Sequence, residues 1–253
     1  MGNRVSSLTG ASASAQNGAI AFTTTQWSVV LNAQGKSASA QEALEKLCRI
    51  YWWPLYGFVR RQGYNPEEAQ DLTQGFFAML LQRRDLDAVR REKGRLRSYL
   101  LASLKNFIGK ARRRAMTVKR GQGRSLVALE ELLARERADV ELADTLTAER
   151  IYERRWALTL LEQVLARLGE EYRVAGSAAL FEQLKQQLTE DPGRPSQAQI
   201  AQELSMTENA VKQAFYRLRQ RYRLLLRDEI AQTVAEPGDV EDELRHFIAI
   251  LQT

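Results

Sequence analysis

The chain has very few of the side chains on which most enzymes depend. Its 253 residues include one cysteine, Cys48, and one histidine, His246. A single cysteine excludes an internal disulfide and a cysteine-based zinc site, and a single histidine leaves little material for a catalytic triad or a metal-dependent hydrolase. The sequence also has no glycine-rich loop of the kind that binds phosphate groups. We therefore expect no catalytic residue, no metal, no cofactor and no enzymatic activity.

Long hydrophobic runs are missing as well. No apolar run approaches the ~20 residues that a membrane-spanning helix needs. The first twenty residues are small and polar, without the apolar core of a secretory signal. We expect a cytoplasmic protein with no membrane contact, in which residues 1–25 form a disordered leader.

Positive charge is concentrated in two blocks. Residues 90–124 hold 13 Lys or Arg against the single acid Glu92, a local balance of +12, so the rest of the chain sums to −6 for a net charge of +6. Residues 209–227 hold six Lys or Arg and no acid. Two basic blocks in an otherwise acidic chain favour a polyanionic partner. The alternative is that each block is a solvated helix face.

Helical periodicity is strong along the chain and strand signals are weak. A first helix is predicted over residues 38–62, kinked or split at Pro54 and ended by Gly63. Its apolar side includes Cys48, which we expect to be a buried structural thiol. The letters NPEE at residues 65–68 are typical of a helix start, because Asn caps, Pro suits the first position and an acid follows three residues after the cap. Further helices are predicted over residues 66–83, 95–115, 148–174 and 177–188.

The most informative segment is PSQAQIAQELSMTENAVKQAFYRLRQRYRLLL, residues 195–226. Ser196 can cap a short helix, and after the turn Ser205-Met206 a second helix can start at Thr207. Two helices joined by so short a turn cross steeply, as in a helix-turn-helix, whose second helix enters the major groove of DNA. The outward positions of the second helix suit bases or phosphates and comprise Glu208, Lys212, Gln213, Tyr216, Arg217, Arg219, Arg221 and Arg223. The alternative is a helical hairpin with a basic surface.

Taken in order, these elements resemble a bacterial RNA polymerase sigma factor of the extracytoplasmic-function type, within the sigma-70 family. The segments YWWPLYGFVRR, AQDLTQGFFAMLL and GRLRSYLLASLKNFIGKARRR resemble sigma domain 2, and PSQAQIAQELSMTENAVKQAFYRLR resembles domain 4. Periodicity and composition predict an all-α fold in two parts joined by a long acidic linker, and the resemblance identifies the parts as two helical sigma domains. The linker is longer than in the compact form of this family. The expected divisions are a leader (1–25), a domain 2-like part (26–118), the linker (119–147), a domain 4-like part (148–234) and an acidic C-terminal helix (235–253).

The same resemblance implies a transcription initiation factor that binds core RNA polymerase and directs it to promoters. In the family, the helix of the DLTQ type docks on the clamp helices of the β′ subunit, the β flap is a second contact, and an anti-sigma factor is a further partner of many members. Gly75 stands where the family commonly has an acid. The docking residues implied here are Asp71, Leu72, Gln74, Phe76 and Phe77, although we expect at least one of the two phenylalanines in the core.

Two DNA sites are also implied by the resemblance. The helix over residues 95–115 would bind the −10 element as an unstacked single strand. The second helix of the helix-turn-helix would read the −35 element as duplex, although Ala214 occupies a position that is often basic in the family. The −10 candidates are Tyr99, whose alternative is a core position, and Lys105, Asn106, Lys110, Arg112, Arg113 and Arg114. The −35 candidates are Lys212, Gln213, Tyr216 and Arg217, with Glu208, Arg219 and Arg221 beside them.

Two other functions remain open. One is a free-standing helix-turn-helix regulator whose N-terminal half binds a ligand or dimerises. The other is a nucleic-acid-processing enzyme, for which Asp71, Asp85 and Asp87 are the candidate metal ligands, although their spacing is poor for shared coordination.

The last segment of the chain is acidic and amphipathic. From residue 228 onward, seven Asp or Glu stand against one Arg. One hypothesis is that this tail or the acidic linker covers a basic DNA-binding surface in the free protein. The alternative is that the tail packs on domain 4 only for stability, and the sequence leaves both open. A helix from Gly238 or Asp239 would place Val240, Leu244, Phe247, Ile248 and Leu251 on one face.

Overall fold

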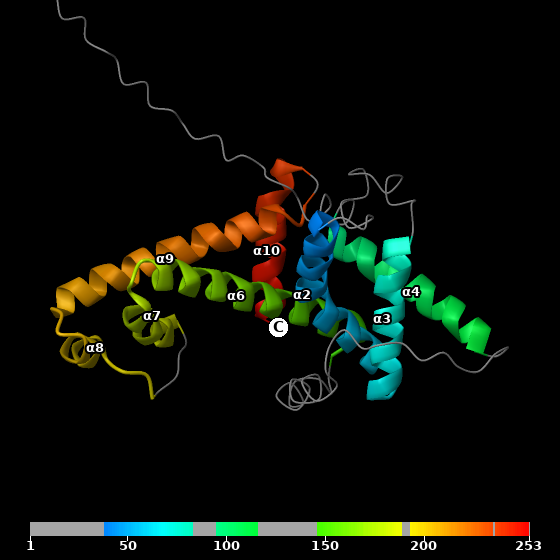
Figure 1. The fold of residues 1–253 in the computed structure, drawn as a ribbon, viewed down its shortest axis with the longest axis horizontal. Helices are drawn as coiled ribbons and strands as arrows, with labels where there is room; N and C mark the ends of the chain where they lie inside the picture. The colour runs from blue at the N-terminus through cyan, green and yellow to red at the C-terminus, as the bar shows by residue number, and fades with distance from the viewer. Residues whose placement is uncertain (1–37, 83–94, 116–145, 189–192, 235, 253) are drawn as a thin grey trace, which may run out of the picture.

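The computed structural model describes residues 38–82, 95–115, 146–188, 193–234 and 236–252, and within these ranges every regular element is a helix (Figure 1). The all-helical prediction is confirmed. The α-helices are α2 (Ala38–Arg61), α3 (Pro66–Gln82), α4 (Leu96–Ala115), α6 (Ala148–Val174), α7 (Ala178–Lys185), α8 (Gln197–Glu203), α9 (Glu208–Ala231) and α10 (Val240–Leu251). The 3-10 turns are η3 (Gln186–Leu188) and η4 (Pro237–Asp239).

The helix boundaries follow the capping signals in the sequence. At the start of α3, Asn65 Oδ1 accepts a hydrogen bond from the Glu68 amide at 2.8 Å, and Glu68 Oε2 accepts one from the Asn65 amide at 3.2 Å. This is a capping box, in which each side chain satisfies a backbone N–H group of the other residue. α2 ends before Gly63, which has a φ of +90°. The helix is not split at Pro54, since the residues on both sides of the proline are held in the core.

The larger hydrophobic core joins segments that are far apart in the sequence. α2 packs on α6 and on α3, and α3 packs on α4. The rings of Trp52 and Phe77 stack with their centroids 5.5 Å apart, and those of Trp156 and Phe247 meet edge to face at 5.8 Å. Ile230 and Val234, at and after the end of α9, are buried in the same core. The helices of the domain 2-like part therefore share a core with the start of α6, the end of α9 and α10.

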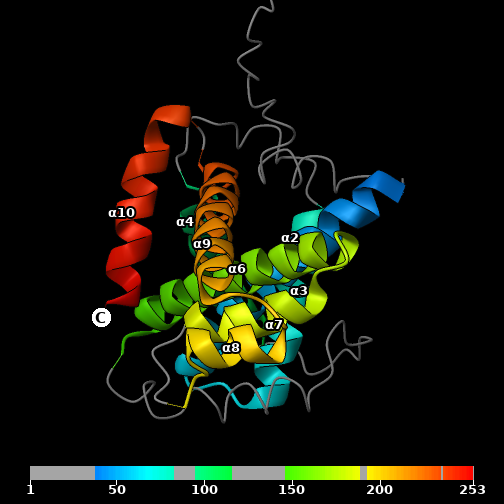
Figure 2. The same ribbon diagram turned by 90° about the vertical axis from the view of Figure 1, so that its left-hand side faces the viewer.

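A smaller core lies at the other end of α6 and is built around Leu168, Phe181, Ile200 and Leu218. α6 and α9 have 27 and 24 residues and contribute to both cores. At 1.5 Å per residue each is about 36–40 Å long, so together they give the molecule a long axis with α8 at one end and α4 at the other (Figure 1). Figure 2 looks along this axis, with α7 and α8 nearest the viewer.

The acidic C-terminal helix forms as predicted and packs on α6 and α9, beside which it stands upright in Figure 2. Its inner face is turned slightly from the predicted one. Ile248 was expected to be inside but is 51% exposed, and Ile250 is buried in its place. The other predicted residues hold: Val240 and Phe247 are buried, and Leu244 and Leu251 are partly buried against the same core.

Some sequence predictions fall on residues that are not described. The leader (1–25) lies outside the described residues, and so does the linker (119–147) apart from Leu146 and Thr147. Asp85 and Asp87 also lie outside them.

Candidate nucleic-acid interface

Helices α8 and α9 form a tight two-helix unit with a defined cap at each boundary. Ser196 Oγ accepts a hydrogen bond from the Gln199 amide at 3.2 Å, and Gln199 Oε1 accepts one from the Ser196 amide at 2.7 Å. At the other end of α8, the Met206 amide donates to the Ala201 carbonyl at 2.8 Å and the Ser205 amide donates to that of Gln202 at 3.3 Å. These two bonds make a Schellman motif.

The turn itself is left-handed at one residue. Ser205 has a φ of 51°, a conformation that is uncommon for a residue with a side chain. α9 then begins at the predicted cap, where Thr207 Oγ1 accepts a hydrogen bond from the Ala210 amide at 3.2 Å. The caps and the short turn fix how the two helices cross, and they confirm the helix boundaries predicted for this segment.

The outward side of α9 is polar, basic and aromatic. We call Lys212, Gln213, Tyr216 and Arg217 the α9 face; all four are exposed, and Tyr216 is 60% exposed. Glu208, in the first turn, is exposed as well. A shallow groove of about 350 Å³ adjoins this face and is lined by Gln197, Lys212, Phe215, Tyr216, Arg219, Gln220 and Arg223.

Two other predicted residues of α9 have intramolecular contacts. Arg219 lies over the ring of Phe215, with 5.8 Å between its guanidinium carbon and the ring centroid. Arg221 makes two hydrogen bonds to the carboxylate of Glu171 in α6, at 2.8 and 2.7 Å. The hydrogen bond from Arg221 lowers the pKa of Glu171. Arg221 therefore ties α9 to α6, a role that the sequence did not indicate.

A second basic surface lies on α4, at the opposite end of the molecule (Figure 1). We call Lys105, Asn106, Lys110, Arg112 and Arg113 the α4 face; all five are exposed. Tyr99 is half-buried against the larger core, in keeping with its alternative, and the side chain of Arg114 lies outside the described residues. A groove of about 250 Å³ runs along this face, lined by Phe58, Gln62, Lys105, Ile108, Gly109 and Arg112.

Contacts within the protein hold two cations of the α4 face. Lys105 Nζ lies 2.7 Å from the carboxylate of Glu149 at the start of α6, and this hydrogen bond lowers the pKa of Glu149. Arg112 Nε donates to the Tyr64 hydroxyl at 2.7 Å, with its guanidinium over the same ring. These pairs are solvent-exposed and therefore weak. They orient the two cations, and a phosphate group can replace them at little energetic cost.

The residues predicted to dock on polymerase do not share one surface. Asp71 is exposed, and Leu72 and Gln74 are half-buried. Phe76 and Phe77, in contrast, are 0% and 1% exposed. At least one phenylalanine was expected in the core, and both are there, so neither ring is available for contact with a partner in this conformation.

Gly75 lies where α3 comes close to α4. A Cβ atom at this position would lie 3.2 Å from the ring of Phe107 in α4. The glycine therefore permits α3 and α4 to approach closely. A side chain at residue 75 would require the Phe107 ring to shift by a few tenths of an ångström.

Sequence reasoning missed a buried ion-pair cluster at the start of α4. Arg97 belongs to the basic block that was expected at a surface, yet it is only 3% exposed. Its guanidinium bonds the carboxylate of Glu243 in α10 at 2.7 and 3.2 Å and that of Glu153 in α6 at 3.0 Å. Burial alone would lower the pKa of Arg97, but the hydrogen bond and charge of Glu243 raise it. No local pattern indicates a partner 146 positions away in the sequence.

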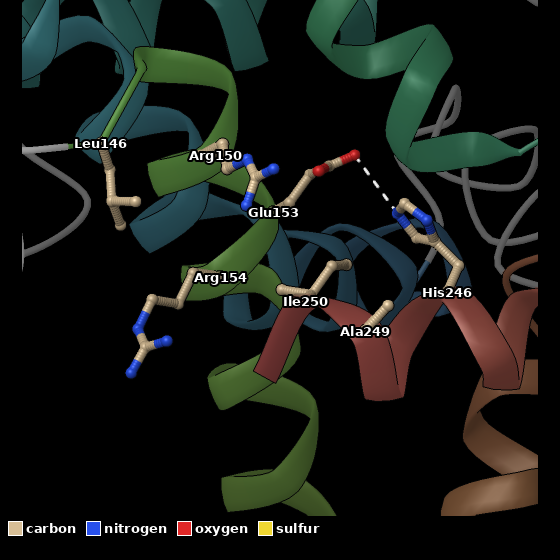
Figure 3. Close-up of a pocket in the computed structure, with 7 residues that line it drawn as sticks. All are labelled: Leu146, Arg150, Glu153, Arg154, His246, Ala249 and Ile250. Carbon is tan, nitrogen blue, oxygen red and sulfur yellow. Dashed lines mark ion pairs between the residues drawn. The ribbon is translucent and has the colours of Figure 1, made fainter. Parts of the chain in front are cut away.

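A small pocket of about 160 Å³ lies between α6 and α10 (Figure 3). Its lining includes Arg150, Arg154, Glu153 and His246, and His246 Nε2 lies 3.4 Å from Glu153. In Figure 3 the side chain of Arg154 extends away from Glu153 and His246. The cations do not converge on one point, so this pocket is a weaker candidate for an anion site than the two basic surfaces.

Within the described ranges, no three His, Cys, Asp or Glu side chains are grouped so that they hold a metal ion. No helix in this part of the chain is long and apolar enough to cross a membrane. Comparison with known proteins gave no match: no family model, no curated protein and no solved structure is similar to this chain.

Proposed function

We propose that the protein is a transcription initiation factor of the sigma type, which binds core RNA polymerase in the cytoplasm and directs it to promoters. The observation that carries the proposal is the α8–α9 unit, with its formed caps and the exposed α9 face. In this proposal the α9 face reads the −35 element as duplex DNA and the α4 face binds the −10 element. The protein itself catalyses no reaction.

The chemistry of the α9 face suits duplex recognition. Lys212 and Arg217 can bond guanine or phosphate, and Gln213 can pair with adenine, all in the major groove. Each good pair of hydrogen bonds to a base discriminates by about 1–3 kcal/mol. Arg223, on the groove beside this face, adds attraction for phosphates that does not depend on sequence.

In this proposal the α4 face binds a single strand. Its groove is lined by exposed cations, and the apolar side chains at its floor, Phe58 and Ile108, are 1% and 6% exposed. Unpaired strands are bound by cations along the backbone and by apolar or aromatic surfaces under the bases. Opening of the promoter at the −10 element would present such a strand.

A second candidate, a helix-turn-helix regulator that acts without polymerase, is favoured by one observation. Phe76 and Phe77 are buried, so the α3 surface offers Asp71 and parts of Leu72 and Gln74 rather than two aromatic rings. A polymerase clamp contact through α3 would therefore be mainly polar. The α4 face favours the initiation factor, because a duplex-binding regulator has no need of a second exposed basic surface at the far end of the molecule.

Co-purification with core RNA polymerase, followed by run-off transcription on a promoter library, distinguishes the two. We expect a stable complex with core and transcripts that start at defined positions. Asp71→Ala should weaken the complex, whereas Glu67→Ala, an exposed acid on the first turn of the same helix, is the matched control. Duplex binding without core binding would show a regulator instead.

A further inference from the structure

The buried carboxylate of Glu243 joins the C-terminal helix α10 to the start of α4. Glu243 is completely buried. One of its carboxylate oxygens lies 2.7 Å from Arg97 Nε, and the other lies 2.6 Å from Arg95 Nε. Arg97 also bonds Glu153 in α6 at 3.0 Å. Two cations thus meet two carboxylates at the point where α4, α6 and α10 come together.

Apolar and backbone contacts surround this cluster. The guanidinium of Arg97 lies over Trp156 of α6, 5.1 Å from the ring centroid, and Phe247 of α10 packs against the same ring. The Tyr152 hydroxyl donates to the Arg97 carbonyl at 2.9 Å, and the Leu96 amide donates to the carbonyl of Thr233, after α9, at 3.3 Å. The start of α4 is therefore joined to the end of α9 both directly and through α10.

These contacts lie between the two DNA-binding candidates. The α9 face is near the α8 end of the molecule and the α4 face is at the other end (Figure 1). α9 runs as one helix from its face to the cluster. The α4–α10 junction therefore contributes to the position of one face relative to the other, together with the packing of α2 on α6 and of α6 on α9.

We propose that α10 and the Arg97–Glu243 pair hold the α4 and α9 faces at a fixed separation, and that this separation sets the spacing between the two promoter elements that the protein accepts. The inference rests on the proposed function. α10 thus acts as a specificity element that does not touch DNA, and Glu243 is a positioning residue.

The positions of the charged residues argue against the hypothesis that the tail covers DNA-binding residues. The tail contacts Arg95, Arg97 and, through Glu241, Arg227, near the end of α9. Lys212, Gln213, Tyr216 and Arg217 stay exposed while α10 is docked. The docked tail therefore leaves the α9 face accessible and fixes its location.

A buried ion pair suits a positioning role. It adds little net stability, because desolvation offsets the attraction between the charges, but it tolerates few geometries. Removal of the Glu243 charge leaves Arg97 with Glu153 as its remaining carboxylate partner at the cluster. We expect the junction to flex while the apolar contacts keep α10 folded.

A distance measurement tests the junction without reference to transcription. In the full chain with Cys48→Ala, spin labels at Ala102→Cys on α4 and Gln202→Cys on α8 report the separation of the two ends; both positions are exposed. We expect one narrow distance distribution, broadened by Glu243→Gln and by Phe247→Leu. Arg245→Ala is the matched control, since Arg245 is exposed on α10 and pairs with Asp242 of the same helix. An unchanged distribution in both junction variants would overturn the proposal.

Run-off transcription with core polymerase on promoters that differ by single base pairs in element spacing tests the consequence. We expect one preferred spacing for the wild type and the control, and a preference about tenfold weaker in Glu243→Gln, equivalent to about 1.4 kcal/mol. An unchanged spacing profile, or an equal rise in activity at every spacing, would overturn the proposal. If the wild type gives no core-dependent transcript, the proposed function fails instead, and the distance measurement still decides whether the ends are held rigidly.

Discussion

At the scale of single residues, one glycine of α2 lies against a buried arginine of α6. Arg155 of α6 is buried and its guanidinium lies 3.9 Å from the centroid of the Trp53 ring. A Cβ atom on Gly57 would lie 2.2 Å from Arg155 Nη1. The absence of a side chain at residue 57 therefore makes room for a buried cation in the main helix interface.

Gly57→Ala should destabilise the protein by about 1–3 kcal/mol, the usual cost of overpacking a core. Gly109→Ala is the matched control, because nothing lies within 4 Å of a Cβ atom there and Gly109 is inside α4. This substitution should stabilise by about 0.5–1 kcal/mol. Denaturant titrations measure both. Equal effects at the two sites would contradict the packing of Arg155 against α2.

The Cys48 thiol provides a prediction that depends on pH. Burial, and to a smaller extent the charge of Glu45, raises its pKa from 9.0 to about 12. The native thiol should therefore react slowly with a thiolate-specific reagent at pH 9 and rapidly after unfolding. Because the folded pKa is the higher one, this group contributes stability that is complete below pH 9 and is lost as the pH rises toward 12. The sequence predicted a buried thiol, and Cys48 is partly buried against the larger core. Fast labelling of the native protein at pH 9 would contradict this position.

At the scale of helices, the cap of α9 should matter more for stability than any residue on its exposed face. Thr207→Ala removes the hydrogen bond to the Ala210 amide and should cost about 1 kcal/mol. Thr207→Ser keeps the hydroxyl and serves as the control. Thermal unfolding followed by circular dichroism measures the difference, and equal melting temperatures for the two variants would show that the cap contributes nothing.

The pairing of α4 with the start of α6 gives a prediction for binding. Glu149→Gln releases Lys105, so affinity for a single-stranded −10 oligonucleotide should rise about twofold, as expected from an exposed pair worth about 0.5 kcal/mol. Glu170→Gln, which removes an acid on the far half of α6, is the control. Fluorescence anisotropy at fixed salt measures the affinities. Weaker binding by the Glu149 variant would argue against a phosphate contact by Lys105.

Local signals in the sequence predicted most helices and missed the contacts between them. The caps at Asn65, Ser196 and Thr207 depend on neighbours within three residues, so their helix starts could be predicted directly. The exposure of the α9 face followed from helical periodicity in the same way. Arg97 and Arg221 looked like surface cations, because the carboxylates that bind them are far away in the sequence.

At the scale of the whole molecule, shared helices join what the sequence suggested were separate parts. α6 and α9 each contribute to both hydrophobic cores, and α10 packs on the larger one. A single elongated unit then carries a basic surface near each end. In the proposed function, this arrangement lets one chain contact two promoter elements at once.

The most direct test of this account is run-off transcription by core polymerase on a promoter with intact or scrambled −35 sequence. We predict that wild-type protein gives a defined start that depends on the intact −35 element. The double variant Lys212→Ala, Arg217→Ala should lose that dependence by about tenfold or more, since each base contact contributes about 1–3 kcal/mol. Arg173→Ala, an exposed cation at the end of α6, should behave as wild type. A wild-type protein that binds duplex DNA but neither associates with core nor supports a defined start would contradict the account.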